Sequence, residues 1–217
     1  MKRRIITLIG VVAIATAALF ALDYFGFIPH KYYSAKRFGI EEIKSNTDAD
    51  DDGIDDYTDI LLSAREYVST KPKYKSEYYV GGYSPDGTGV CTDVIWRAFK
   101  GAGYDLKQMV DADILSNPDR YPSIEKPDSN IDFRRVRNLL PFFEAHAKAL
   151  TIDTSQIAEW QAGDIVIFKG HIAIVSDRRN KSGKPFIIHH ANPYQLYYEE
   201  DALTTSGEII GHFRWEK

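Results

Sequence analysis

Cys91 is the single cysteine of this 217-residue chain, and its side chain has the clearest capacity for chemistry. A lone thiol cannot form an internal disulfide, so it serves either packing or reactivity. Gly87 and Gly89 lie just upstream, and an apolar repeat at helical spacing follows, which predicts that Cys91 lies in the first turn of a helix. The positive end of the helix dipole favours the nucleophilic thiolate there. The alternative is a small buried hydrophobic residue, since free cysteines are often buried.

A cysteine nucleophile needs a histidine within hydrogen-bond reach and a third group that orients that histidine. Apolar runs predict short antiparallel strands at 163–168, 170–177 and 186–190. His171 then starts one strand, and His189 or His190 ends the next, which brings the histidines close together. Because strand side chains alternate between faces, only one of His189 and His190 can point at His171.

The elements that would position these residues follow from periodicity and composition. Helices are predicted at 56–69, 91–103, 106–116 and 132–149. Helices first and a strand meander later indicate an α+β architecture. The chain is 44% hydrophobic and 13% aromatic, as expected of a globular protein. The net charge is −4 and the one dense charge cluster after the N-terminal segment is acidic, which argues against a nucleic-acid partner.

A family pattern surrounds Cys91. Residues 78–87 contain an aromatic pair, a Gly-Gly pair and a Pro/Gly turn; the cysteine then opens a helix that leaves through glycines to Leu106. Together with the strands that follow, these segments resemble the NlpC-type cysteine peptidases of bacterial cell walls. A closer resemblance, over residues 55–215, is to an uncharacterised bacterial domain family usually grouped with these peptidases.

The resemblance implies a fold and a set of roles. It implies a papain-like domain at 55–217, in which the cysteine at the N-terminus of a helix packs on a small antiparallel sheet or half-barrel. Cys91 is then the nucleophile, His171 the general base and His189 the orienting residue, with His190 as the competitor for that third role. One departure is that the usual Asp-Cys-Ser-Gly is replaced by Val, Cys, Thr and Asp at 90–93.

Further residues receive supporting roles by the same reasoning. The backbone N–H of Cys91 can donate to an oxyanion, and Tyr78 or Tyr79 is the family-like second donor. Arg134 and Arg135 could bind a substrate carboxylate through bidentate contacts. An ion pair with a nearby carboxylate is the alternative for these arginines, and the candidate partners are Asp128, Asp132 and Glu144. The expected substrate-binding set is Arg134, Arg135 and Asp93.

The N-terminus predicts the location of the protein. Lys2, Arg3 and Arg4 precede an uncharged apolar stretch at 5–22, which is longer than the core of most signal peptides and long enough to span a membrane. We therefore expect residues 1–28 to form a signal anchor, with a single transmembrane helix in a bacterial cell membrane and the rest of the chain on the extracytoplasmic side. If the segment is cleaved after the small residues at 15–17, the protein is secreted.

A polar connector and most of an acidic loop form the predicted linker at 29–54, and the acidic loop itself spans 48–59. Acidic oxygens at alternate positions, with a glycine after the third, are the ligand layout of calcium loops. The expected ligands are Asp48, Asp50, Asp52, Ile54 through its carbonyl, Asp56 and Asp59. A solvated acidic linker that caps the next helix is the alternative. Calcium would be structural, and no cofactor is expected for catalysis.

The leading hypothesis is an anchored hydrolase that cleaves amide bonds in peptidoglycan stem peptides through Cys91 and His171. One alternative is a module of the same fold that binds wall peptide or a protein partner without turnover. Another is a different thiol acyltransferase or amidase. Digestion of purified peptidoglycan distinguishes among them.

Overall fold

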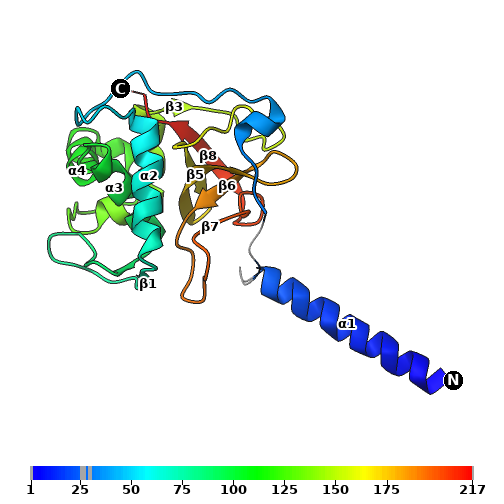
Figure 1. The fold of residues 1–217 in the computed structure, drawn as a ribbon. Helices are drawn as coiled ribbons and strands as arrows, with labels where there is room; N and C mark the ends of the chain where they lie inside the picture. Colours follow the sequence, from blue (N-terminus) through cyan, green and yellow to red (C-terminus); the bar gives the residue numbers. More distant parts are fainter. Residues whose placement is uncertain (1, 25–27, 29–30, 217) are drawn as a thin grey trace.

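A computed structural model of the chain describes residues 2–24, 28 and 31–216 (Figure 1). Its helices are α1 Lys2–Tyr24, α2 Asp56–Ser69, α3 Cys91–Gly101, α4 Leu106–Ser116 and α5 Val136–His146, with short 3-10 turns at Ala35–Phe38, Pro118–Arg120 and Asp132–Arg134. Its strands are β1 Lys73–Tyr74, β2 Thr88–Gly89, β3 Lys148–Ala149, β4 Ile165–Phe168, β5 His171–Arg179, β6 Pro185–Ile188, β7 Glu199–Glu200 and β8 Ile209–Arg214. The helices therefore precede an antiparallel sheet in a mixed α and β architecture.

The larger sheet has the strand order β3-β8-β4-β5-β6-β7, and each neighbouring pair is antiparallel. In the β4–β5 hairpin Phe168 pairs with His171 across a tight turn. In the β5–β6 pair Ile174 lies opposite Ile188, so the chain that leaves β6 returns toward the start of β5. This register brings His171 and the residues after Ile188 to the same end of the sheet.

Alternating side chains of the sheet separate two apolar layers. Isoleucines 165, 167, 172, 174 and 188 face the helices, and they join the same cluster as the buried residues of α2 and α3. Val166, Phe168, Ala173, Val175 and Ile187 face the other side, around Trp160 and Leu203. Figure 1 shows α2 and α3 side by side on the first of these faces.

Close packing of α2 on α3 depends on a glycine. A Cβ atom added at Gly101 would lie 1.9 Å from the Ser63 hydroxyl oxygen, so no larger residue fits at this crossing without displacement. The helix α3 in turn packs on β5, and Cys91 at its start meets the backbone N–H of Ile172 near the start of that strand.

Two of the four predicted helices, 56–69 and 106–116, are confirmed at both ends, and the helix that starts at Cys91 ends at Gly101 rather than at 103. The prediction of one helix over 132–149 is wrong. A 3-10 turn occupies Asp132–Arg134, Arg135 is extended with φ −106° and ψ 116°, and α5 begins only at Val136. The chain becomes extended again after His146, because residues 148–149 pair with β8 as β3.

The N-terminal helix α1 stands clear of the folded body in Figure 1, and its apolar side chains at positions 9, 11, 12, 14, 19, 20 and 22 are exposed. None of the helices within the described part of the chain is long and apolar enough to cross a membrane. The predicted anchor at 1–28 includes residues 1 and 25–27, which lie outside the described residues. The anchor stays a prediction.

Candidate active site

Cys91 is the first residue of α3, as its sequence context predicts. Val90, before it, is extended, with φ −139° and ψ −173°. The Asp93 carboxylate accepts a hydrogen bond from the Val90 N–H at 2.8 Å, which satisfies one of the donors that a helix start leaves unpaired. Gly89 is required just upstream, since a Cβ there would lie 2.2 Å from the Tyr67 hydroxyl oxygen. The start of the helix is thus held rigidly.

The Cys91 sulfur lies beside the start of β5. Burial raises the pKa of the thiol to about 11, while backbone N–H groups of Ile172, Thr92 and Cys91 itself act in the opposite direction. Burial is the largest of these effects, so it outweighs the helix N-terminus and favours the thiol over the thiolate. Ile172 follows His171 directly, so the sulfur lies at the end of β5 where the predicted base begins the strand.

His171 belongs to a hydrogen-bonded chain of three side chains. Its Nε2 atom lies 2.8 Å from Nδ1 of His189, and Nε2 of His189 lies 2.9 Å from a carboxylate oxygen of Glu200. Gln195 donates a further hydrogen bond to the same Glu200 oxygen at 3.0 Å. The structure therefore brings His189, rather than its neighbour His190, to His171.

The chain has one consistent proton arrangement when its end is a carboxylate. A carboxylate only accepts, so Nε2 of His189 carries a hydrogen toward Glu200 and its Nδ1 becomes an acceptor. Nε2 of His171 then donates to that Nδ1, which leaves Nδ1 of His171 as a free base. Burial, together with the neighbouring His189 and His190, lowers the pKa of His171 to about 3, so its imidazole is neutral at physiological pH. A neutral base and a protonated thiol are the resting state.

No hydrogen bond joins the Cys91 sulfur to His171 among the residues that the structure describes. Catalytic hydrogen bonds are often long before substrate binds, and they shorten in the complex. The two groups therefore lie at the same end of β5 without the ion pair that many cysteine nucleophiles have.

His190 lies between two tyrosine rings. Its ring centroid is 5.2 Å from that of Tyr74 and 4.9 Å from that of Tyr198, and it is 1% exposed. Neither ring nitrogen has a hydrogen-bond partner within the described residues. Burial lowers the pKa of His190 to about 4, so it is also neutral at physiological pH. Tyr74 lies near Cys91 as well: burial raises the pKa of its phenol, and a thiolate at Cys91 would raise that pKa further.

Arg134 and Asp93, both predicted to bind substrate, instead bind each other inside the protein. Two guanidinium nitrogens of Arg134 donate to the two carboxylate oxygens of Asp93, each at 2.9 Å, and both side chains are buried. Trp96 donates to Asp93 at 2.8 Å, and Arg134 also donates to the Glu77 carbonyl at 3.0 Å. The interpretation as substrate-binding residues is wrong for this pair. The ion-pair alternative holds, but with a partner that is distant in the sequence.

The remaining supporting residues, Tyr78, Tyr79 and Arg135, differ in what they contact. The Tyr78 hydroxyl donates to Asp128 at 3.1 Å and accepts from Asn130 at 2.8 Å. The Tyr79 ring stacks on the Arg134 guanidinium, and its buried hydroxyl has no partner in the described chain. Arg135 is exposed. Tyr78 is thus held by the 128–130 loop, whereas Tyr79 and Arg135 keep groups that a ligand could use.

The acidic loop brings three of its six predicted ligands together. Asp48, Asp50 and Asp52 offer oxygens that all lie within 4.8 Å of one another. Asp56 does not join them, because its buried carboxylate accepts from Ala49 at 2.9 Å and from Tyr104 at 2.6 Å. Asp56 is therefore a structural residue, and its assignment as a ligand is wrong.

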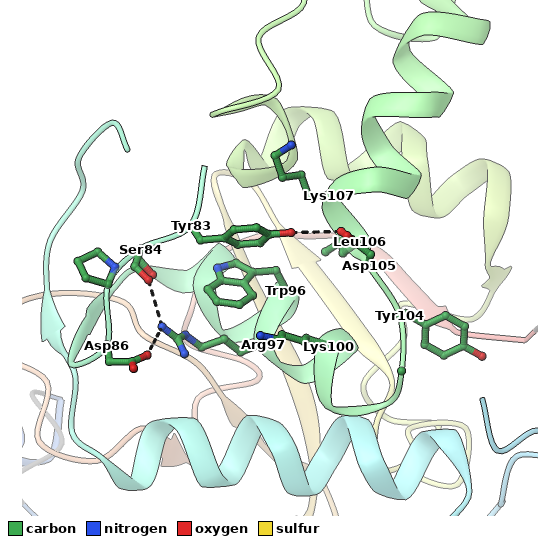
Figure 2. A pocket seen from close by; sticks show the side chains of 12 residues that line it. Tyr83, Ser84, Asp86, Trp96, Arg97, Lys100, Tyr104, Asp105, Leu106 and Lys107 are labelled. Carbon is green, nitrogen blue, oxygen red and sulfur yellow. Dashed lines mark hydrogen bonds and ion pairs between the residues drawn. The ribbon is translucent and has the colours of Figure 1, made fainter. Parts of the chain in front are cut away.

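A pocket lies elsewhere on α3 (Figure 2). It has a volume of about 640 Å³, and Figure 2 shows Tyr83 directed at Asp105 and Arg97 directed at Ser84 and Asp86. The pocket has aromatic and charged walls, but neither Cys91 nor any histidine lines it. It is separate from the candidate active site.

Glu200 and Tyr74 are site residues that sequence reasoning missed. Glu200 lies in the two-residue strand β7, which pairs with β6 so that Glu200 is opposite Ile187. A pair of glutamates after a loop is indistinguishable in sequence from a solvated acidic segment. Tyr74 lies in the equally short β1. Only the pairing of these strands could have identified either residue.

Comparisons with known proteins match this region of the chain. The family described as "Domain of unknown function (DUF1287)" matches residues 61–215. The uncharacterized protein YijF of Escherichia coli (strain K12) is 37% identical over 152 residues, which cover 66% of this chain and 72% of that relative. No solved structure matches the chain significantly. The matched residues include Cys91, His171, His189 and Glu200, and they begin after the acidic loop.

Proposed function

For this chain, which belongs to the DUF1287 family, we propose the function of a thiol hydrolase with Cys91 as nucleophile and His171 as general base. The hydrogen-bonded chain from Glu200 through His189 to His171 carries this proposal. A half-buried carboxylate and a buried histidine that orient a second histidine are what a general base requires, whereas packing alone requires no such arrangement. The cysteine at a helix N-terminus beside that base supplies the matching nucleophile.

In the proposed reaction an amide carbonyl binds next to the Cys91 sulfur. Nδ1 of His171 takes the thiol proton as the sulfur attacks the carbonyl carbon, and the backbone N–H groups at the start of α3 donate to the developing oxyanion. The C–N bond then breaks, and His171 gives its proton to the leaving amine. Water, deprotonated by His171, releases the acyl group from the thioester. His189 and Glu200 hold the base in one tautomer throughout.

We further propose that the substrate is a peptidoglycan stem peptide and that the fold is papain-like. The resemblance to the NlpC-type peptidases supports both, as does a cysteine helix packed on an antiparallel sheet. The basic N-terminal cluster and the apolar run after it support placement outside the cytoplasm, anchored through residues 1–28.

One observation favours a second candidate, a peptide-binding module without turnover. The Cys91 thiol has a raised pKa and no hydrogen bond to His171 in the described structure. A protein that only binds wall peptide has no need of a thiolate.

Digestion of purified peptidoglycan tests the two candidates. The full-length chain in mild detergent is incubated with the polymer, and released fragments and new amino termini are identified by mass spectrometry. We expect release by the wild type and none by Cys91→Ser, since serine keeps the side-chain volume but is a far weaker nucleophile with this base. Equal release by both proteins would contradict the role of Cys91. Binding of the polymer without release by the wild type would favour the binding module.

The same assay tests the third residue. His189→Ala and Glu200→Gln should lower the rate of release, because each breaks the chain that orients His171. His190→Phe is the matched control, since a phenyl ring fits between Tyr74 and Tyr198 and no hydrogen bond is lost. Melting temperatures confirm that each variant is folded. A larger loss of rate in His190→Phe than in His189→Ala would move the third role to His190.

A further inference from the structure

The acidic loop directly before α2 gathers negative charge. Oxygens of Asp48, Asp50 and Asp52 converge to within 4.8 Å of one another, and the loop turns at Gly53 with φ 93°. Three carboxylates at this separation repel one another in water. By itself such a cluster is a common feature of exposed loops.

Asp59 gives a second, independent observation that indicates a bound ion. It lies in the first turns of α2, only 5% of it is exposed, and its Oδ2 atom is buried without a hydrogen-bond partner in the described chain. The charges that act on it most strongly are Asp52, Asp50 and Asp48, which add to burial in raising its pKa to about 6. A buried carboxylate oxygen without a hydrogen-bond partner lacks the compensation that buried charges normally have.

We propose that Asp48, Asp50, Asp52 and Asp59 bind one hard divalent cation, calcium, with the Ile54 carbonyl as a further ligand. All these donors are oxygens, and an irregular set of carboxylates and a carbonyl suits the flexible coordination of calcium better than the strict octahedron of magnesium. Asp56 is not a ligand, because its carboxylate is fully buried and accepts from Ala49 and Tyr104. Asp48 accepts from the Asp52 and Gly53 N–H groups but stays partly exposed, and its oxygens converge with those of Asp50 and Asp52. The site is independent of the proposed hydrolase reaction.

The position of the loop indicates what the ion would do. Asp50 packs against the turn between α3 and α4, where a Cβ added at Gly103 would lie 3.0 Å from the Asp50 Cβ. Asp59 belongs to α2. A cation shared by Asp50 and Asp59 therefore ties the connector to α2 next to the end of the cysteine helix. Its role is structural.

Calcium titration of the full-length chain in mild detergent tests the site. After removal of metal with EGTA, isothermal titration with CaCl2 should give one ion per chain with a dissociation constant of about 0.1–1 mM, the range of extracellular calcium modules. The melting temperature should rise at about 10 mM calcium, because the ion binds only the folded state. Sodium chloride at equal ionic strength controls for screening of the carboxylates.

Variants locate the ion. Asp50→Asn and Asp59→Asn should each weaken calcium binding about tenfold or more and reduce the calcium-dependent rise in melting temperature. Asp59→Asn should also raise the melting temperature without calcium, since it removes a buried charge among like charges. Asp51→Asn is the matched control: Asp51 lies in the same loop outside the cluster, is exposed, and has φ 60°, which asparagine tolerates.

Three results would contradict the calcium site or part of its assignment. No heat of binding together with no calcium-dependent shift would overturn the proposal. If Asp51→Asn weakened calcium binding as much as Asp50→Asn and Asp59→Asn do, the acidic loop would attract cations diffusely and would hold no defined site. Equal affinity for magnesium would overturn the assignment to calcium.

Discussion

At the scale of single residues, two opposing effects act on Cys91. The helix N-terminus and the Ile172 N–H favour the thiolate, but removal of the sulfur from water favours the thiol and is the larger effect. Burial also favours the uncharged form of His171, and for an imidazole this lowers the pKa. In a water-poor site the uncharged pair is therefore more stable than the ion pair, and proton transfer must accompany attack on a substrate.

The alkylation rate of Cys91 should report this resting state. We expect the rate with iodoacetamide to be low at neutral pH and to rise continuously up to about pH 11, the pKa to which burial raises the thiol. His171→Ala should change this profile little, because no ion pair is lost. The measurement is the labelling rate by mass spectrometry from pH 5 to 11. A plateau below pH 7 that disappears in His171→Ala would instead show a preformed thiolate–imidazolium pair.

At the scale of elements, the first turn of α3 is held by residues from a distant segment. Arg134, in the 3-10 turn before α5, reaches the Asp93 carboxylate, and the Thr92 hydroxyl donates to the Arg134 carbonyl at 3.2 Å. The orientation of the cysteine helix thus depends on the segment around residue 134. The sequence of α3 predicts that the helix forms, whereas tertiary contacts of this kind decide its orientation.

Breaking that ion pair should destabilise the fold strongly. Arg134→Met leaves the Asp93 carboxylate buried without its partner, and such changes cost about 3–5 kcal/mol. Combining it with Asp93→Asn should recover part of the loss, because the uncompensated charge is removed. Urea denaturation measures these changes. Arg135→Met is the control, since the neighbouring arginine is exposed and should change stability by less than about 0.5 kcal/mol. Equal effects of the two single changes would refute a stabilising ion pair.

At the scale of the whole molecule, the fold holds His171 and His190 as neutral side chains. The pKa of His171 falls to about 3 and that of His190 to about 4, both chiefly through burial, from an ordinary 6.5. The unfolded chain therefore takes up protons below pH 6.5 while the folded chain does not. Their contribution to stability is complete above pH 6.5 and is lost as the pH falls toward 4 and then 3.

Stability should accordingly decline on acidification. We expect the free energy of unfolding from urea titrations to fall between pH 6.5 and 4, and the double variant His171→Asn, His190→Phe to show a shallower decline. The raised pKa of Asp59 contributes the opposite trend in both proteins, so the comparison of slopes isolates the histidines. Parallel slopes would mean that neither histidine is held neutral by the fold.

The sequence by itself determined the local structure around the chemistry. The glycines before Cys91 and the apolar repeat after it predicted the start of α3, and the apolar runs predicted β4, β5 and β6, with His171 opening a strand. These features follow from periodicity and backbone preference over a few neighbouring residues. The alternation of strand side chains also predicted that only one of His189 and His190 meets His171, without deciding which.

Only the tertiary structure decided which distant side chains meet. It paired Arg134 with Asp93, 41 positions away, and Glu200 with His189, and it turned Asp56 inward to Tyr104, 48 positions away. It also made burial outweigh the helix dipole at Cys91. Partner choice and desolvation depend on the packing of the complete chain, because a charged side chain pairs with whichever group the fold brings within reach and away from water.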